Sequence, residues 1–464
     1  MSGVRTLVVA YDFPPHAAIG TQRTLRFVRH IDAEGWPVAV LTGDPARFRK
    51  GTPVDHALLH RVPASVDVTR TTVLRPIDAF STLVRGRSSS ASKPQPTAND
   101  GPRVPAVTAA RPSALRAIKQ WIDVVSTIPD AEVGWLIPTV VRGVRFARRW
   151  RPEVIYSSAP PWTGHLVAGA VATLTGRPWV ADFRDPWARA PWRSARAHPL
   201  ANSAAARLER WAVARAAAII FTTEAVREEF ATRYGEPLSA KFSVIPNGCD
   251  ASMFDGIPDE QPEPFVLLHA GSLYGGRDPQ PLFRAIASAI ESGRIDRRAF
   301  RLRLLGAVAL GDTNLERAAT ALGLGDVIEL LPRADHRASL HAMKAASALL
   351  LLQQGTTMSV PAKLYEYLAA GKRIFAICEE GETAALVRAS GAGVVAPPSD
   401  ARSLEDALVE FVNARGVGQP RPDRALFDGG VGAARTSAIV EAVARRRAMA
   451  PNAHAATGGA GSGV

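Results

Sequence analysis

The sequence predicts an α/β protein with two consecutive parallel sheets, and three observations support this prediction. The chain has 464 residues, about three times the ~150 typical of one domain. Short apolar runs rich in β-branched residues alternate with segments of helical periodicity along most of the chain. An acidic, proline-rich stretch at 255–264 separates two such series of similar size, which indicates a linker between two domains.

The first series opens with an apolar strand, a helix with separate apolar and basic stripes, and a second strand. This order within ~40 residues indicates a parallel βαβ unit. The expected strands are 6–11, 37–42, 154–157, 179–183, 219–222 and 242–245. The expected helices are 20–34, 115–125, 140–150, 163–175 and 204–217. Residues 85–113 are rich in Ser, Pro and Ala without apolar periodicity, so we expect a flexible insertion there.

The second series repeats the alternation after the linker. Its expected strands are 265–269, 301–305, one near 327, 349–352, 373–377 and 393–395. Its expected helices are 315–322, 339–346, 362–370 and two that begin at 281 and 383. We therefore expect domains at 1–250 and 265–430 joined by a linker at 251–264. A C-terminal helix at 431–451 is expected to pack back toward the first domain, and a disordered tail at 452–464 follows.

Two loop-to-helix junctions of the second series are suited to an anion, because ligands of open α/β sheets bind outside the carboxyl ends of the strands. The first junction, 270–278 (AGSLYGGRD), offers three glycines and Arg277. An ordinary strand-to-helix turn is the alternative reading. The second junction leads into the helix that Pro361 opens and Gly371 closes, with Ser359 or Thr357 as its expected cap.

Lys363 stands in the first turn of this second helix, where the helix macrodipole disfavours a cation by ~0.3–1 kcal/mol unless an anion is bound. Together with free N–H groups it would suit a diphosphate, and Glu366 one turn on could accept hydrogen bonds from a ribose. A simple surface pair between Lys363 and Glu366 is the alternative. Leu364, Tyr367 and Leu368 form the expected inward stripe of the helix.

The charge of the chain is uneven. The formal net charge is +13, and the whole excess lies within residues 1–250, as do all nine tryptophans. This asymmetry favours an anionic partner for the first domain, and nucleic acid, an anionic membrane or an acidic acceptor would each satisfy it. A solvated basic surface is the alternative. The sequence carries no nucleic-acid-binding signature, so we expect no nucleic-acid partner.

The composition favours a reducing compartment and a chain without a membrane span. Cys249 and Cys378 lie far apart and form no redox or metal motif, and no apolar run approaches the ~18 residues that cross a bilayer. The N-terminus runs into a strand without a cleavable signal. We therefore expect a cytoplasmic protein that needs no cofactor and no metal, because the sequence has no Asp-x-Asp motif and no cluster of His and Cys.

Four segments, in this order, resemble the family-four glycosyltransferases, which are retaining enzymes of the GT-B fold with nucleotide-sugar donors. Residues 11–15 (YDFPP) with Gly20 are similar to the opening glycine loop of the family. Residues 182–187 (DFRDPW) resemble a loop of a bacterial subgroup that acts on envelope and exported polysaccharides. Residues 245–250 (IPNGCD) resemble a Pro-Asn-Gly-x-Asp signature, and 361–371 resemble the second half of a paired-glutamate element.

The resemblance implies two Rossmann-like domains facing across a cleft, and a metal-independent retaining transferase. A nucleotide-diphosphate sugar would be the donor substrate, and a lipid-linked or glycan acceptor would serve cell-envelope or exopolysaccharide biosynthesis. The implied catalytic residues are Arg277, Lys363 and Asp185. The implied donor contacts are Gly20, Gly271, Ser272, Val360, Pro361, Ala362 and Glu366. The acceptor-side candidates are His16, Asp182 and Arg184.

Three positions depart from the family pattern. Met358 replaces the first glutamate of the paired element, and Ser272 replaces the arginine of a Gly-Arg-Leu turn. Arg184 aligns with the family's histidine in the first domain, whose work Asp182 or Asp185 could share. Helix capping, or pairing with Arg184, is the alternative role of these two carboxylates.

Two further expectations concern the first domain. His16, in the proline-rich loop, is a candidate base, whereas His165, at an apolar helix start, favours a structural role. An interfacial helix on anionic headgroups would use Trp135, Trp150, Arg142, Arg145, Arg148, Arg149 and Arg151. A core position of the tryptophans is the alternative.

A nucleotide-sugar epimerase with the same double-sheet plan is the alternative function of the protein.

Overall fold

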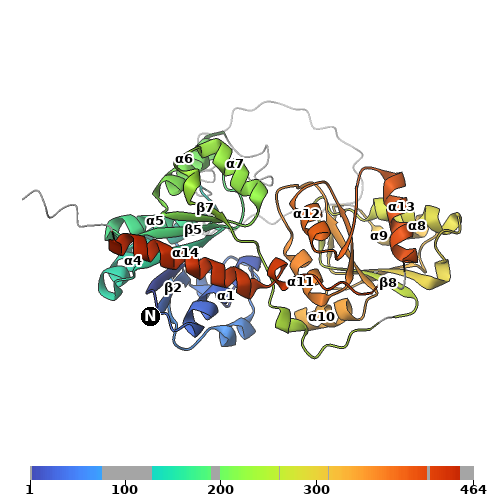
Figure 1. Cartoon of the computed structure of the whole chain (residues 1–464), viewed down its shortest axis with the longest axis horizontal. Coiled ribbons are helices and arrows are strands. Elements are labelled where there is room, and N and C mark those ends of the chain that lie inside the picture. Colours follow the sequence, from blue (N-terminus) through green and yellow to red (C-terminus); the bar gives the residue numbers. More distant parts are fainter. Residues whose placement is uncertain are drawn as a thin grey trace, which may run out of the picture. The chain divides into compact units, whose positions relative to one another are not determined.

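The computed structural model describes residues 3–75, 128–189, 199–260, 262–311, 313–414 and 418–449 (Figure 1). The expected insertion at 85–113, the expected helix at 115–125 and the expected tail at 452–464 lie outside the described residues. The chain divides into two compact units. The first comprises Met1–Thr21, Gly35–Ala217 and Val443–Val464, and the second comprises Gln22–Glu34 and Ala218–Ala442.

The first sheet has seven strands in the order β3-β2-β1-β4-β5-β6-β7. These strands are β1 (Thr6–Val9), β2 (Val38–Gly43), β3 (Asp67–Thr71), β4 (Val154–Ala159), β5 (Trp179–Phe183), β6 (Ala218–Phe221) and β7 (Phe242–Val244). Strand β1 pairs in parallel with β2 and β4, and β4 pairs in parallel with β5. Every residue of β1, β2, β4, β5 and β6 is buried, as expected for parallel strands covered on both faces.

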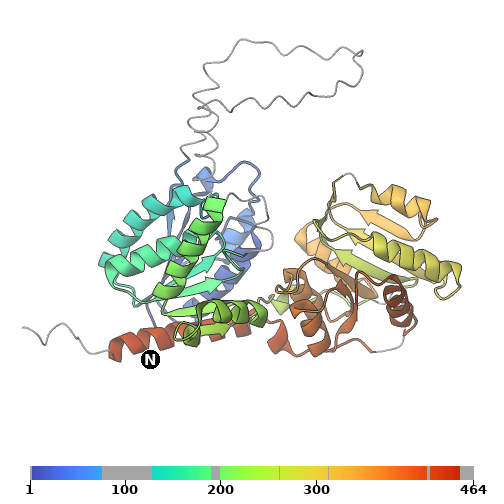
Figure 2. The same ribbon diagram turned by 90° about the horizontal axis from the view of Figure 1, so that it is seen from above.

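Five helices accompany the first series of strands. They are α1 (Ile19–Ala33), α4 (Leu136–Trp150), α5 (Thr163–Thr175), α6 (Pro199–Arg215) and α7 (Glu224–Tyr234). Figure 2 shows α4 and α5 lying side by side, and α5 also packs on β4. Gly176 ends α5 with a left-handed backbone (φ 62°), which glycine adopts without strain. The parallel pairing and the helical connections agree with the predicted βαβ organisation.

The second sheet has six strands in the order β12-β10-β8-β13-β14-β15, and all of its strand pairs are parallel. Its strands are β8 (Phe265–Ala270), β10 (Phe300–Leu305), β12 (Ile328–Leu331), β13 (Ala348–Gln353), β14 (Arg373–Cys378) and β15 (Gly393–Ala396). A short ladder pairs β9 (Leu273–Tyr274) with β11 (Val308–Ala309). The accompanying helices are α8 (Gln280–Glu291), α9 (Leu315–Ala321), α10 (His336–Lys344), α11 (Ala362–Ala370), α12 (Glu382–Ala389) and α13 (Ala401–Asn413). Helix α14 (Gly429–Met449) follows them in the chain, and its Arg435 donates to the Val244 carbonyl at the end of β7 (2.8 Å).

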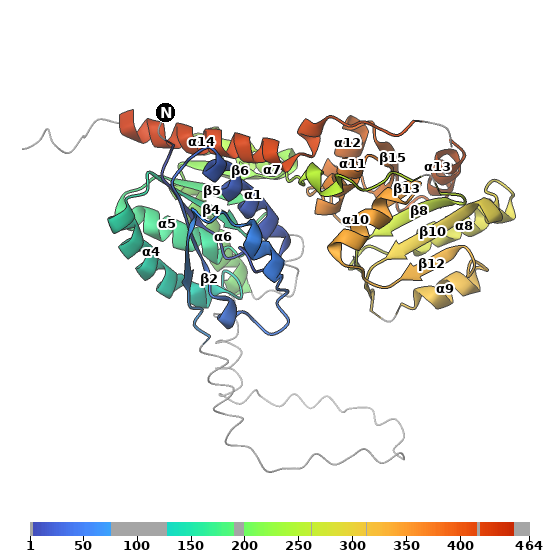
Figure 3. The same cartoon turned by 90° about the horizontal axis from the view of Figure 1, so that it is seen from below.

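Side chains alternate between the two faces of this second sheet, as the period of a strand requires. Phe265 and Leu267 of β8 pack with residues of α8, α9 and α13, whereas Val266 and Leu268 pack with residues of α10, α11 and α12. Figure 3 shows the strands between these two groups of helices. Both faces of β8 are therefore covered, and its carboxyl end leads into the glycine-containing junction at 270–278.

Most expected elements agree with the structure, and α5, β5 and α11 agree to the residue. Five elements have no counterpart among the expected ones: β3, α7, α13 and the two short strands β9 and β11. Strand β3 (DVTRT) is a polar edge strand that lacks an apolar run, and α7 carries three glutamates and two arginines, so little apolar periodicity marks it. Helix α4 begins four residues earlier than predicted, because the single turn Val133–Trp135 leads directly into it.

Candidate functional site

The junctions after β8 and β13 meet at the carboxyl edge of the second sheet. A Cβ atom at Gly271 would lie 3.6 Å from Nε2 of His269 and 3.8 Å from Cε of Lys363. The Lys363 side chain therefore runs past the glycine that follows β8. Its Nζ lies 2.7 Å from Oε2 of Glu366, and the Lys363 side chain is 32% exposed. The structure thus brings Gly271, Lys363 and Glu366 together.

Helix α11 begins without a side-chain cap among the described residues. Pro361 itself is the N-cap, with extended backbone (φ −68°, ψ 141°), and Ala362 and Lys363 form the first turn. The expectation that Ser359 or Thr357 caps this helix is wrong, because the Ser359 hydroxyl lies 3.1 Å from that of Thr356. The N-terminal end of α11, which is the positive pole of the helix, therefore lies at the same sheet edge as Lys363. This end is formed by Val360, Pro361 and Ala362.

The buried side of α11 fixes this arrangement. Leu364, Tyr367 and Leu368 are buried as predicted, and Tyr365 is buried as well. The Tyr367 hydroxyl accepts a hydrogen bond from the N–H of Ala270 (2.9 Å), at the last residue of β8. The first turns of the helix are thereby fastened to the strand whose loop contains Gly271 and Ser272.

Arg277 lies in the turn between β9 and α8. Its Nη2 donates to Oε1 of Gln353 (3.2 Å), the last residue of β13, and its guanidinium lies 4.4 Å from the ring centre of Tyr274. The Gly271 N–H donates to the Leu305 carbonyl (2.9 Å). The absence of a side chain at Gly271 remains its contribution.

His269 is a member of this site that the sequence prediction missed. It is buried at the end of β8, and its Nδ1 lies 3.0 Å from the Leu350 carbonyl, so Nδ1 carries the proton. Burial, followed by the charges of Arg277 and Lys363, lowers the pKa of His269 to about 4. A histidine within an apolar run gave no signal in the sequence. Arg277 and Lys363 both lie close enough to its ring to lower its pKa.

The carboxyl edge of the first sheet carries a second group of candidate residues. Asp12 lies on the loop after β1, and its carboxylate accepts from Nη2 of Arg184 (2.9 Å) and lies 3.0 Å from Nδ1 of His16. Arg184 also donates to the carbonyl of Pro160. A Cβ atom at Gly20 would overlap the Arg184 guanidinium. Asp12, which the prediction omitted, therefore joins His16 to Arg184, and Gly20 lies against Arg184.

The two carboxylates of residues 182–187 have different surroundings. Asp182 is fully buried and accepts from the Tyr156 hydroxyl (2.7 Å) and the Ser158 hydroxyl (3.0 Å). Asp185 is half-buried, and burial raises its pKa, although the charge of Arg184 lowers it. For Asp12, burial alone would raise the pKa, but the hydrogen bond from His16 and the charge of Arg184 hold it below its usual value. Asp182 is thus part of a buried hydrogen-bond network, whereas Asp185 is partly exposed to solvent.

His165 lies in the core of the first unit, which agrees with the structural alternative. Its Nδ1 lies 2.8 Å from the Ser157 hydroxyl, which also accepts from the indole N–H of Trp179 (2.8 Å). The ring is 4.4 Å from that of Phe183. Burial lowers the pKa of His165 to about 3, so the ring is neutral at neutral pH.

The two buried histidines predict a loss of stability below pH 6.5. Their native pKa values lie below the ~6.5 of a histidine in an unfolded chain. Below that pH these histidines are protonated in the unfolded state but not in the native state, so acid favours unfolding. At pH 5 each histidine is expected to lower the free energy of unfolding of its unit by about 2 kcal/mol relative to pH 7.5. Since all tryptophans lie between Trp36 and Trp211, their fluorescence follows the unit that contains His165, and circular dichroism follows both units.

The measurement is denaturant unfolding at pH 7.5 and pH 5. His269→Asn should remove the loss in the second unit, and exposed His336→Asn should leave it. Equal stability of the wild-type protein at both pH values would contradict the prediction.

Trp135 does not belong to a membrane-facing surface. It is fully buried, and its indole N–H donates to the Thr71 hydroxyl (2.7 Å). The expectation that Trp135 lies on headgroups is therefore wrong, because its ring packs 5.5 Å from that of Tyr11 in the core. The exposed side chains of α4 include Ile137 (69% exposed) and Val141 (46% exposed), and four arginines accompany them. The exposed arginines are Arg142, Arg145, Arg148 and Arg149.

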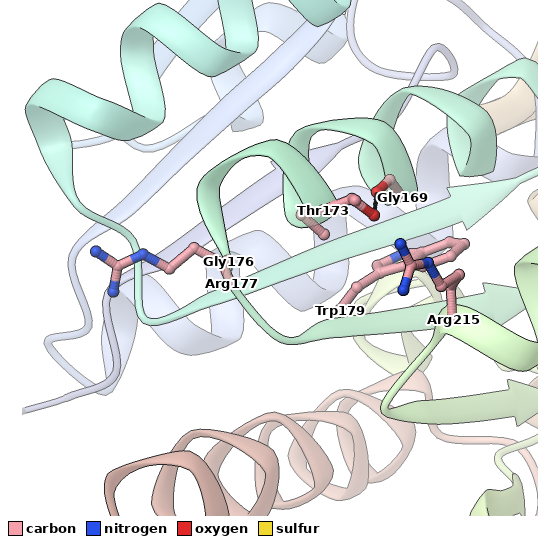
Figure 4. Close-up of a pocket in the computed structure, with 7 residues that line it drawn as sticks. Gly169, Thr173, Gly176, Arg177, Trp179 and Arg215 are labelled. Atoms are coloured by element: carbon pink, nitrogen blue, oxygen red, sulfur yellow. Dashed lines mark hydrogen bonds between the residues drawn. The ribbon is translucent and has the colours of Figure 1, made fainter. Parts of the chain in front are cut away.

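A separate pocket of about 300 Å³ lies in the first unit, away from the candidate residues. Gly169, Ala172, Thr173, Gly176, Arg177, Trp179 and Arg215 line it. Figure 4 shows Thr173 bonded to the Gly169 carbonyl (2.8 Å) and Arg177 extending away from Trp179 and Arg215. Arg215 ends α6 and Arg177 follows α5, so both guanidinium groups lie at helix C-termini, where they offset the negative pole of the helix. We assign the pocket no ligand.

No group of three or more His, Cys, Asp and Glu side chains among the described residues is arranged to hold a metal ion. No helix in the described part of the chain combines the length and apolarity that crossing a membrane requires.

Part of the sequence and the fold of the chain are similar to those of glycosyltransferases. Residues 98–253 match the sequence profile of Glycosyltransferase Family 4. HepE from Anabaena, solved in complex with UDP, is 15% identical over 97% of this chain and 98% of its own, with a TM-score of 0.55. Sucrose-phosphate synthase from Thermosynechococcus elongatus is 15% identical over 96% of each chain, with a TM-score of 0.55.

A UDP-GlcNAc 2-epimerase from Methanocaldococcus jannaschii has a similar fold as well. It is 9% identical over 94% of this chain and 99% of its own, with a TM-score of 0.52. None of the curated proteins compared with this chain matches it. At such low identities the solved structures show the fold alone, and that fold confirms the predicted class, α/β of the GT-B type with two Rossmann-like domains.

Proposed function

We propose that this protein is a glycosyltransferase that transfers a sugar from a nucleotide-diphosphate sugar to a lipid-linked or glycan acceptor. One observation carries the proposal: Lys363, at the start of α11, lies against Gly271 and beside Glu366 at the carboxyl edge of the second sheet. A helix N-terminus, an ammonium and a nearby guanidinium suit a diphosphate. A carboxylate one turn deeper suits the two hydroxyls of a ribose. The sequence match to Glycosyltransferase Family 4 and the UDP bound in HepE support this choice of ligand.

In the proposed reaction the bond between the sugar C1 and the diphosphate oxygen breaks, and the acceptor oxygen forms the new bond to C1 on the same face. The acceptor proton passes to the departing phosphate, so the anomeric configuration is retained and neither a protein nucleophile nor a metal is required. Arg277 and Lys363 stabilise the charge that grows on the diphosphate, and they act more strongly as it develops. Arg184, His16 and Asp185 are proposed to orient the acceptor.

The first test is binding. Isothermal titration calorimetry with UDP, GDP, ADP and dTDP should identify one nucleoside diphosphate that binds, with EDTA present throughout. Glu366→Ala should weaken binding of the corresponding nucleotide sugar without unfolding the protein, because it removes the proposed ribose contact. Unchanged affinity would remove Glu366 from the site, and no binding to any of the four nucleotides would contradict the proposal.

The second test is the reaction itself. NMR of the bound donor sugar with an acceptor panel should show transfer with the anomeric configuration retained. The same donor incubated alone should keep its sugar unchanged. A new epimer formed without any acceptor would instead favour the epimerase, which the fold of the UDP-GlcNAc 2-epimerase also accommodates.

We also propose that α4 rests on an anionic membrane surface in the cytoplasm, as a peripheral site of transfer to a lipid-linked acceptor. Ile137, Val141 and Arg145 follow one another at intervals of four and so share one face of α4, and Arg148 and Arg149 continue it. Apolar tips beside arginines are the composition of an interfacial helix. Each arginine near an anionic surface contributes about 1 kcal/mol.

Flotation with liposomes containing an anionic lipid should recover the protein at low salt, and recovery should fall as salt is raised. Arg145→Glu with Arg148→Glu should abolish recovery, whereas neutral liposomes should recover little of the wild-type protein. If anionic liposomes fail to recover the protein even at low salt, this face of α4 is not a membrane surface.

A further inference from the structure

Two consecutive glutamines at the end of β13 hold the turn that carries Arg277. Oε1 of Gln353 accepts from Nη2 of Arg277 (3.2 Å). Oε1 of Gln354 accepts from the N–H of Asp278 (3.0 Å), and its Nε2 donates to the Asp278 carbonyl (3.4 Å). Gln353 therefore contacts the guanidinium of Arg277, and Gln354 contacts the backbone of the next residue, Asp278.

The turn itself gives Arg277 little guidance. Two glycines precede Arg277, and Gly275 has a left-handed backbone (φ 60°) with no atom near the place of a Cβ. The Tyr274 ring covers one face of the guanidinium at 4.4 Å, but Tyr274 is half-exposed. Gln353, by contrast, is buried. Because the Gln353 side chain is buried, it has less freedom to move than Tyr274 and is the better fixed of the two partners of Arg277.

The chemistry of an amide suits this task better than that of a carboxylate. A glutamate at 353 would pair with Arg277 and cancel much of the positive charge that a diphosphate would meet. An amide oxygen accepts one N–H and leaves the net charge of the guanidinium intact. Because the guanidinium is planar and rigid, this one hydrogen bond also sets the direction of its other N–H groups.

From these contacts we propose that Gln353 and Gln354 are positioning residues that aim Arg277 at the donor diphosphate. Gln353 sets the guanidinium and Gln354 sets the turn. This inference rests on the proposed function and extends it to two residues outside the predicted site. Neither glutamine needs to touch the donor, because both act through Arg277.

The test uses the full-length protein and the nucleoside diphosphate that wild-type protein binds most tightly among UDP, GDP, ADP and dTDP. Gln353→Leu should weaken calorimetric binding by about tenfold or more, since a hydrogen bond to a charged group is lost. Gln353→Glu, with nearly the same shape, should weaken it further. Gln280→Leu is the matched control: Gln280 contacts Asp278 in the same turn but not Arg277, and less than a twofold change is expected.

A double-mutant cycle separates positioning from a general structural role. In an Arg277→Ala background, Gln353→Leu should have no further effect on binding, because the group that it positions is gone. In the wild-type background it should lower kcat for sugar transfer more than it raises KM. Additive effects in the cycle, or a Gln353→Leu or Gln353→Glu protein that binds as wild type does, would overturn the inference. Wild-type protein that binds none of the four nucleotides would instead overturn the proposed function.

Discussion

Replacing Lys363 with methionine is expected to lower kcat/KM for the nucleotide-sugar donor by about 10²–10³-fold and to leave the fold intact. The ammonium lies in the first turn of α11 beside Gly271, where the charge of the departing diphosphate would develop. Removing one preorganised donor from such a site costs about 2.7–4 kcal/mol of transition-state stabilisation. That energy corresponds to the stated loss in rate.

The expected change in stability is small because two effects oppose each other. Lys363 in the first turn is disfavoured by the helix macrodipole by ~0.3–1 kcal/mol. Its ion pair with Glu366 (2.7 Å) is partly exposed and contributes ~0–1 kcal/mol. Methionine removes both effects, and its apolar side chain, which ends at Cε, keeps most of the length of the lysine. Steady-state kinetics and thermal unfolding of the same protein preparation therefore distinguish a functional lysine from a structural one.

Lys344→Met is the matched control for this substitution. Nζ of Lys344 donates to the Ala370 carbonyl (3.2 Å), at the last residue of α11. The same chemical change at the opposite end of the helix should cost some stability and leave kcat/KM unchanged. Equal kinetic losses in the two variants, or an unchanged kcat/KM in Lys363→Met, would exclude Lys363 from the diphosphate site.

The fold was predictable from the sequence where burial dominates. The continuous apolar runs of β8 and β13 and the glycine stops of α5 and α11 mark their elements, because both faces of the sheet are covered and the helix ends need a left-handed residue. Strand β3 was missed because an edge strand needs fewer apolar residues. The start of α4 was missed because the turn Val133–Trp135 runs directly into the helix and no capping residue marks the boundary between them.

The candidate site was predictable only in part, and for a physical reason. Lys363 and Glu366 stand out because a cation at a helix start is unfavourable without a partner. His269 and Gln353 do not stand out, since each ends an apolar strand and gains its meaning from neighbours distant in sequence. Asp12 gave no separate signal either, because its partner Arg184 meets it only when β1 and β5 lie in one sheet.

Asp12→Ala is expected to lower the free energy of unfolding of the first unit by about 3–5 kcal/mol, the usual cost of removing one partner from a buried ion pair. The side chains of Asp12 and Arg184 are 11% and 9% exposed, so solvent screens their interaction little. The variant also releases His16 from its carboxylate, and sugar transfer should fall with stability. Tryptophan fluorescence in denaturant measures the loss in this unit, and exposed Asp67→Ala is the control, with a change within about 0.5 kcal/mol.

Gly20→Ala tests the same interaction from the other side, because the added methyl would overlap the Arg184 guanidinium and force it away from Asp12. A similar loss of stability is expected, and Asp12→Ala in the Gly20→Ala background should add little to it. The pH dependence gives an independent check. The native pKa of Asp12 lies below its usual value, so its contribution is present above the unfolded pKa of ~3.9 and is lost as the pH falls through the native pKa. The gap between wild type and Asp12→Ala should therefore persist at pH 5 and close only in stronger acid; a gap that closes already near pH 6 would contradict the assignment of the effect to the Asp12 carboxylate.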